Sequence, residues 1–168
     1  MQRNSVAIVG AAESTHMGKL PEMAQIQIHA DSALNALADC GLTIKDIDGV
    51  ATAGHNAVEL AHYMGITPTW VDGTSVGGCS FMLHVRHAAA AIEAGLCTTA
   101  LITHGESGRH WIGRHGPAIF PSLFQMQFEQ PYGVTRPPTM FTIPVMRYMT
   151  DYGLTEEQLA MVAVTQRE

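Results

Sequence analysis

The stretch from Asp72 to Cys79 places a hydroxyl and a thiol beside three glycines, directly before a predicted helix over 78–94. A helix N-terminus presents unpaired amides and a partial positive charge, which stabilise a thiolate or a developing oxyanion. Cys79 is therefore a candidate nucleophile, and Ser75 is a second candidate that would need a base to activate it. The alternative for Cys79 is a buried thiol that packs as a small hydrophobic group.

The three glycines, Gly73, Gly77 and Gly78, favour a tight turn between a strand and a helix. Glycine has no side chain, so the backbone here would allow a ligand to approach closely. We expect Gly77 and Gly78 to contact the reacting end of such a ligand.

Three histidines near this stretch are candidate general bases, because imidazole titrates near neutral pH. His84 and His87 are three residues apart and would share one face of the predicted helix. His104 ends a predicted strand, close to where ligands bind in parallel sheets, and it is the predicted catalytic histidine. The alternative for each is a packed histidine in the core or at an interface.

A long segment over 106–136 combines glycines, prolines, aromatic residues and arginines. Long irregular segments in compact domains are commonly lids or binding loops. The alternative is a protein interface, since the same residue types are enriched there. His110 and His115 in this segment, with His104, suggest metal ligands, but no cysteine or carboxylate stands at metal-ligand spacing. We therefore predict no metal site.

The composition limits the classes of partner and compartment. The chain has 168 residues, 46% of them hydrophobic, and a net charge of −6 without runs of one sign. These values are typical of a globular domain and disfavour a nucleic-acid or anionic membrane surface as partner. Three cysteines without CxxC spacing argue against a disulfide scaffold, and the N-terminal apolar stretch is too short for a signal peptide or a membrane span. A cytoplasmic protein is the prediction.

The elements that would position these residues alternate between strands and helices. Strands are predicted at 6–9, within 47–54, at 69–71 and within 97–105. Helices are predicted between them at 23–39, 56–65 and 78–94, with Asn56 as an N-cap and Gly41 just past the end of the first. In the third helix the predicted apolar stripe consists of Phe81, Val85, Ala88 and Ile92. This alternation predicts an α/β layered fold in which the first four strands form a mostly parallel sheet flanked by helices.

The remaining residues are predicted to be helical again. A helix with prolines in its first turns is predicted over 137–153, and another over 155–168 with a capping box formed by Thr155 and Gln158. The last helix carries no stop signal, so we expect the chain to be the front part of a longer protein. The predicted division is an α/β core over 1–105, a loop or lid region over 106–154, and the start of a helix that returns to the core over 155–168.

The motif "VDGTSVGGCSF…AAAAIEAGLCTTALITHGE" resembles the nucleophile turn, the following helix and the next strand of the thiolase superfamily. "AIVGAAES" resembles the opening strand of sterol-carrier-type thiolases, "DIDGVATAG" their second strand, and "LTEEQLAMVAV" a later helix. The resemblance is greatest to the thiolase-like lipid-transfer branch, which includes aldolases that shorten steroid side chains. It implies a thiolase-like layered fold of which this chain is the incomplete N-terminal part.

The nucleophile position departs from the family pattern. An ungapped alignment from Val71 puts Ser75 at the position of the family's cysteine, whereas counting back from "IEAG" reaches Gly78, next to Cys79. Both registers stay open, as does the choice between Ser75 and Cys79.

The resemblance implies an enzyme that binds coenzyme A as an acyl-CoA substrate and makes or breaks a carbon–carbon bond beside the thioester, by acyl transfer or by retro-aldol cleavage. Arg109 and Arg114 would then lie near the phosphates, with the aromatic residues of 106–136 along the acyl chain or adenine. The alternative is a non-catalytic thiolase-like scaffold. The family pairs through the strand before the nucleophile turn, here 69–71, which predicts a homodimer or a complex with a small partner subunit.

Overall fold

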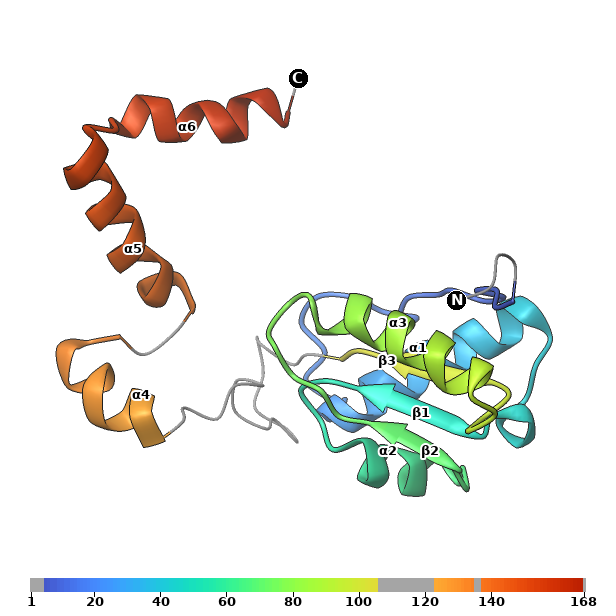
Figure 1. Cartoon of the computed structure of the whole chain (residues 1–168). Helices are drawn as coiled ribbons and strands as arrows, with labels where there is room; N and C mark the ends of the chain where they lie inside the picture. The colour runs from blue at the N-terminus through green and yellow to red at the C-terminus, as the bar shows by residue number, and fades with distance from the viewer. Residues whose placement is uncertain (1–4, 106–122, 135–136, 168) are drawn as a thin grey trace. The chain divides into compact units, whose positions relative to one another are not determined.

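The structure is a computed structural model that describes residues 5–105, 123–134 and 137–167 (Figure 1). The chain divides into two compact units, Met1–Phe120 and Pro121–Glu168. The candidate site lies in the first unit.

The first unit contains a three-stranded parallel sheet. Its strands are β1 (Gly49–Thr52), β2 (Trp70–Asp72) and β3 (Ala100–Thr103), in the order β2-β1-β3. Val50 of the central strand lies opposite Val71 on one side and Leu101 on the other. Parallel strands have both faces covered, and Val50 and Ala51 are accordingly fully buried. The predicted α/β fold with a parallel sheet is confirmed.

Helices cover both faces of this sheet (Figure 1). α1 (Gln25–Cys40) and α2 (Ala57–Met64) contact each other and pack on one face, whereas α3 (Ser80–Glu93) packs against β1 and β3 on the other. The main apolar core lies between the sheet and the first two helices. It comprises Ala33, Leu37, Ile47, Val50, Ala57, Leu60, Ala61, Met64, Ile66 and Leu101.

The ends of these helices follow the signals in the sequence. Asn56 caps α2, because its side-chain oxygen accepts hydrogen bonds from the amides of Val58 and Glu59 at 2.8 and 3.2 Å. Gly41 follows α1 with a φ of 71°, a left-handed conformation that glycine adopts without strain. Both predicted boundaries are therefore confirmed.

The prediction of a strand at 6–9 is wrong. These residues form no ladder with any described strand, although Ile8 and Val9 have the apolar character of a strand. The segment is held at its ends instead, since Ser5 Oγ donates to Glu93 of α3 at 2.6 Å and the Ala11 amide donates to Asp39 of α1 at 3.1 Å. Together with the edge strand β3 it lines a cavity of about 580 Å³. A strand requires a hydrogen-bonded neighbour as well as a suitable composition.

The apolar stripe predicted for α3 is only partly right. Ala88 is buried, but Val85 is 42% exposed and the first buried residues of the helix are Ser80 and His84. The buried face of α3 therefore includes two polar side chains, Ser80 and His84. Both form hydrogen bonds with the turn before the helix.

The second unit is helical where it is described. It contains α4 (Leu123–Phe128), α5 (Pro137–Tyr152) and α6 (Glu156–Thr165). The helices predicted over 137–153 and 155–168 are confirmed. The predicted capping box is present at the start of α6, where the Thr155 amide donates a hydrogen bond to the Gln158 side chain at 2.9 Å. By contrast, α4 and a short 3₁₀ turn (Gln130–Tyr132) fall within the segment predicted as a loop, of which 106–122 lie outside the described residues. The domain division of the prediction stays a prediction.

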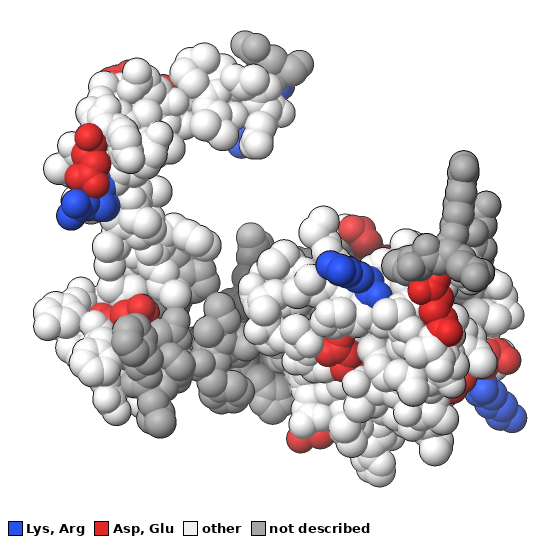
Figure 2. Space-filling model, viewed as in Figure 1, with Lys and Arg blue, Asp and Glu red and all other residues white. Residues whose placement is uncertain are grey.

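Charged side chains are scattered among uncharged ones on the face shown in Figure 2. Of the helices that the structure describes, none combines the length and the apolar character needed to cross a membrane.

Candidate functional site

The turn at residues 73–79 connects the carboxyl end of β2 to the N-terminus of α3. Gly77 has a φ of 86°, a left-handed conformation that lets the chain reverse before the helix. Cys79 follows in the N-cap position of α3. This is the predicted placement of the turn at a helix N-terminus, on the side of a parallel sheet where ligands commonly bind.

Asp72, the last residue of β2, holds the start of the turn. Its Oδ1 accepts hydrogen bonds from the amide and the hydroxyl of Thr74 at 2.8 and 2.7 Å, and its Oδ2 accepts one from His87 Nδ1 at 2.6 Å. Burial alone would raise the pKa of Asp72, but the hydrogen bonds from Thr74 and His87 favour the charged form and lower its pKa below 3.8. Asp72 therefore acts as a charged anchor between β2, the turn and α3.

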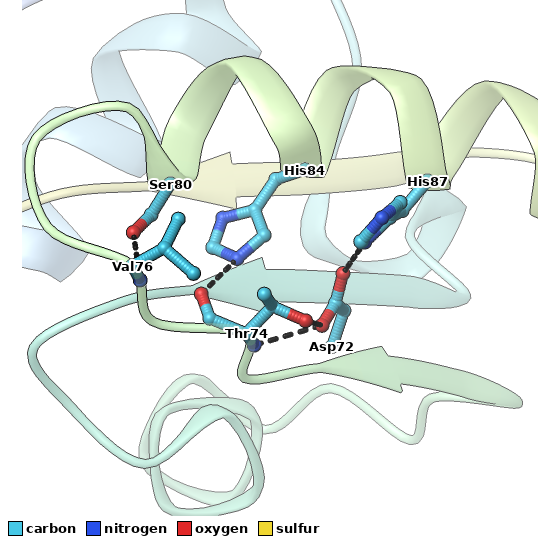
Figure 3. Close-up of polar contacts among 6 residues, drawn as sticks. All are labelled: Asp72, Thr74, Val76, Ser80, His84 and His87. Carbon is cyan, nitrogen blue, oxygen red and sulfur yellow. Dashed lines mark hydrogen bonds and ion pairs between the residues drawn. The ribbon is translucent and has the colours of Figure 1, made fainter.

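Two further side chains of α3 hold the middle of the turn (Figure 3). His84 Nε2 donates to the Thr74 carbonyl at 2.9 Å. Ser80 Oγ accepts a hydrogen bond from the Val76 amide at 2.9 Å. It also donates one to the Gly77 carbonyl at 2.6 Å. We call Ser80, His84 and His87 the turn clamp. Their spacing of four and three residues places all three on one face of the helix.

The turn clamp changes the interpretation of the predicted bases. His84 and His87 were candidate general bases, but in the structure His84 binds the backbone of the turn and His87 binds the carboxylate of Asp72 at the end of β2. Ser80, which is fully buried, was not singled out in the sequence. Its spacing from the two histidines was the signal that could have identified it.

The two candidate nucleophiles, Ser75 and Cys79, are both exposed in this turn. The Cys79 thiol makes a long contact with the Val76 carbonyl, at 3.7 Å. The buried-thiol alternative therefore does not describe Cys79, but it does describe Cys97, whose burial and proximity to Asp48 raise the pKa of its thiol. Gly77 and Gly78 of the same turn would carry an added Cβ without contact within 4 Å, so space for a ligand adjoins their backbone.

His104, the predicted catalytic histidine, directly follows β3. Its ring lies 4.4 Å from the ring of Phe81 in the first turn of α3 and 6.3 Å from that of His29, measured between centroids. Phe81 therefore brings the end of β3 next to the N-terminus of α3. His104 and Cys79 thus belong to neighbouring parts of the fold.

His29 of α1 is fully buried behind His104. Its Nδ1 lies 2.9 Å from Thr103 Oγ1, and the Thr52 hydroxyl donates to the Thr103 carbonyl at 2.9 Å. Burial, reinforced by the nearby His55 and His104, lowers the pKa of His29 to about 3. A neutral histidine that was not predicted from the sequence therefore supports the carboxyl ends of β1 and β3.

A cavity of about 510 Å³ opens beside the end of β3. It is lined by residues of the 10–20 segment, by α1 and by 102–105, including His104 and Gly105. The 73–79 turn does not line this cavity. The candidate site thus consists of the exposed turn and this cavity. His104 lines the cavity and lies near Phe81 of α3 and His29 of α1.

Two predicted binding residues, Arg109 and Arg114, lie outside the described residues, as do His110 and His115. Within the described ranges, no group of three or more His, Cys, Asp or Glu side chains is arranged to hold a metal ion.

Comparison with known proteins adds to this geometry. No family model matches the chain. The chain is 28% identical over 173 residues to an acetyl-CoA acetyltransferase of Methanothermobacter thermautotrophicus, covering 97% of the chain and 44% of that protein. It is 25% identical over 172 residues to a steroid side-chain-cleaving aldolase of Thermomonospora curvata, with 96% and 44% covered. It is 26% identical over 180 residues to the 17-hydroxy-3-oxo-4-pregnene-20-carboxyl-CoA lyase of Mycobacterium tuberculosis, with 100% and 46% covered.

A solved structure, the Ltp2-ChsH2(DUF35) aldolase, has the same fold. Its TM-score to this chain is 0.70 at 24% identity, and the match covers 89% of the chain and 39% of that structure. This chain is thiolase-like. The thiolase-like chain spans less than half the length of the relatives that it matches.

Proposed function

We propose that this chain contributes the nucleophile turn of an acyl-CoA enzyme that makes or breaks a carbon–carbon bond next to a thioester, in lipid or steroid metabolism. The observation that carries the proposal is the exposed thiol of Cys79 at the N-cap of α3, beside the end of β3. The similarity to an acetyl-CoA acetyltransferase and to two steroid-processing enzymes supports this class of substrate.

In the acyl-transfer form of the reaction, the Cys79 thiolate attacks the thioester carbonyl. A sulfur–carbon bond to Cys79 forms, the bond to the coenzyme A sulfur breaks, and coenzyme A leaves as a thiol after taking up a proton. The amides of the turn and of the first turn of α3 would stabilise the negative charge that develops on the carbonyl oxygen. In this form Gly77 and Gly78 would lie next to the thioester, and His104 would be the base.

In the retro-aldol form, a base removes the proton of a hydroxyl group on the β-carbon of the acyl chain. The bond between the α- and β-carbons breaks, and the β-carbon leaves as the carbonyl carbon of an aldehyde or ketone. The electrons move onto the thioester as an enolate, which the same oxyanion-binding amides would stabilise. No covalent acyl-enzyme is formed. Ser75 would then contribute only a hydrogen bond, which is compatible with a serine at the family's nucleophile position in the ungapped register.

Coenzyme A recognition is proposed to involve Arg109 and Arg114, since guanidinium groups bind phosphates in a bidentate manner. A homodimer is proposed through β2, because this strand is at one edge of the sheet and Val71 is 42% exposed. A small partner subunit is the other arrangement, and the two-part name of the aldolase with a similar fold supports it.

The second candidate function is a non-catalytic thiolase-like scaffold that binds acyl-CoA or a partner protein. It is favoured by the finding that the histidines of α3, His84 and His87, hold the turn. Neither then serves Ser75 or Cys79 as a base.

A trapped acyl-enzyme separates these functions. The complete protein, with any partner subunit, is incubated with acetyl-CoA or a longer acyl-CoA, quenched in acid and digested for mass spectrometry. Acyl transfer predicts an acyl group on the peptide that carries Cys79, lost in Cys79→Ala and retained in Ser75→Ala. Retro-aldol cleavage predicts no adduct, and turnover of a hydroxyacyl-CoA that survives Cys79→Ala. Acyl-CoA binding without either reaction would support the scaffold. Absence of acyl-CoA binding would contradict the enzyme and would leave only a scaffold that binds a partner protein.

A further inference from the structure

We propose that His84 is a positioning residue that fixes the backbone on both sides of Ser75 in concert with Ser80. The turn clamp contacts the turn in reverse order: His87 holds Asp72, His84 holds the Thr74 carbonyl, and Ser80 holds the Val76 amide (Figure 3). Each successive contact along the helix thus fixes a successive point of the turn.

The geometry of the peptide unit explains why His84 acts on Ser75. The Thr74 carbonyl and the Ser75 amide belong to one planar peptide unit, so fixing the carbonyl also fixes the direction of the amide. The next unit, between Ser75 and Val76, is fixed by the hydrogen bond from the Val76 amide to Ser80 Oγ at 2.9 Å. Ser75 is therefore flanked by two anchored peptide planes, which set its φ and ψ and with them the direction of its side chain.

His84 itself is held rigidly. It is fully buried, and the ring of Phe81 packs edge-on against it with 5.9 Å between centroids. Phe81 also contacts His104, so the same aromatic ring supports the positioning histidine and the predicted base. A shift of His84 would consequently displace the turn relative to the end of β3.

The contact is specific to one ring nitrogen. A carbonyl oxygen only accepts hydrogen bonds, so Nε2 of His84 must carry the hydrogen. The amide nitrogen of a glutamine can reach the position of Nε2, whereas that of an asparagine reaches only the position of Nδ1. A positioning role therefore predicts that His84→Gln restores the contact and that His84→Asn and His84→Leu do not.

The geometric part is tested by amide hydrogen exchange at Thr74 and Val76, whose amides are hydrogen-bonded in the turn. In His84→Leu and His84→Asn we expect exchange at both amides to accelerate about fivefold to tenfold, as one lost hydrogen bond implies, and in His84→Gln to stay near the wild-type rate. His29→Gln is the matched control, because His29 is equally buried in the same unit but does not contact the turn. Equal protection in all three His84 variants, or equal loss in His29→Gln, would overturn the proposal.

Nitrogen-15 spectra of the wild-type protein provide a test that needs no variant. We expect His84 to carry its hydrogen on Nε2, and a hydrogen found only on Nδ1 would refute the contact. The consequence for turnover rests on the proposed function: His84→Leu should lower kcat with little change in KM, and His84→Gln should recover it. If exchange behaves as expected while neither the wild type nor any variant has acyl-CoA turnover, the proposed function fails and the positioning role stands.

Discussion

His87 Nδ1 lies 2.6 Å from Asp72 Oδ2, so the second turn of α3 is tied to the residue that ends β2. The same carboxylate accepts two hydrogen bonds from Thr74. One charged group therefore joins the sheet, the turn and the helix. The stability of this region should depend on its ionisation.

Replacing Asp72 by Asn should lower the free energy of unfolding at pH 7 by about 1–3 kcal/mol, the usual effect of losing a charged hydrogen-bond partner. Because the folded-state pKa of Asp72 is depressed, its contribution is fully present above 3.8 and is lost as the pH falls through the lower folded value. Urea unfolding at several pH values should therefore show the wild type and Asp72→Asn converging in acid. A constant difference down to the acid limit would contradict this assignment.

His29 should make stability depend on pH in a higher range. Its pKa falls from 6.5 in the unfolded chain to about 3 in the folded one, so its stabilising effect is complete above 6.5 and declines as the pH falls toward 3. The slope attributable to this group approaches about 1.4 kcal/mol per pH unit within that window. In His29→Gln the curve of unfolding free energy against pH should be flatter between pH 6 and pH 4, because about one proton fewer is taken up on unfolding. Parallel curves for the two proteins would rule out His29 as the source.

Gly77 and Gly78 form a matched pair for the turn. Gly77 has a φ of 86°, so Gly77→Ala should cost about 1 kcal/mol or more of stability, whereas Gly78→Ala meets no atom within 4 Å and should be near neutral. If a thioester contacts this backbone, the methyl group of Gly78→Ala should still weaken acyl-CoA binding. Thermal unfolding combined with calorimetric titration of acyl-CoA measures both effects. Unchanged binding by a stable Gly78→Ala would argue that the ligand lies elsewhere.

The exposed edge of β2 should mediate pairing. In sedimentation experiments at micromolar concentration we expect a dimer, and Val71→Lys should shift it toward monomer because a charge on an edge strand disfavours pairing with another strand. Val85→Lys, at an equally exposed valine of α3, is the control and should leave the dimer intact. A monomeric wild type would exclude pairing through this edge.

The parts of the fold that sequence reasoning predicted well are those whose causes are local. A cap such as Asn56 needs only the next two or three residues, and Gly41 needs only its own φ. The segment 6–9 shows the limit, since its apolar pattern suits a strand but no described strand pairs with it. Pairing depends on residues far away in the chain, which no local pattern contains.

The candidate site shows the same distinction. The placement of Cys79 at a helix N-terminus was predictable from the glycines and from the helical period that follows. The function of His84 and His87 was not, because imidazole suits a base and a hydrogen-bond donor equally, and only the path of the turn decides between them. The exposure of Val85 has the same cause, because a helix that buries Ser80 and His84 turns Val85 toward solvent.

The spacing of the turn clamp links the reactive turn to the phase of α3. Each residue of an α-helix advances the direction of its side chain by about 100°, so one residue inserted between Ser80 and His84 would move both histidines off the face that meets the turn. Insertions of three, four or seven residues come close to whole rotations and would return the histidines to roughly the correct face, but they would place them about 4.5 to 10 Å further along the axis. The length of the first two turns of α3 is therefore as tightly constrained as the identity of its polar residues.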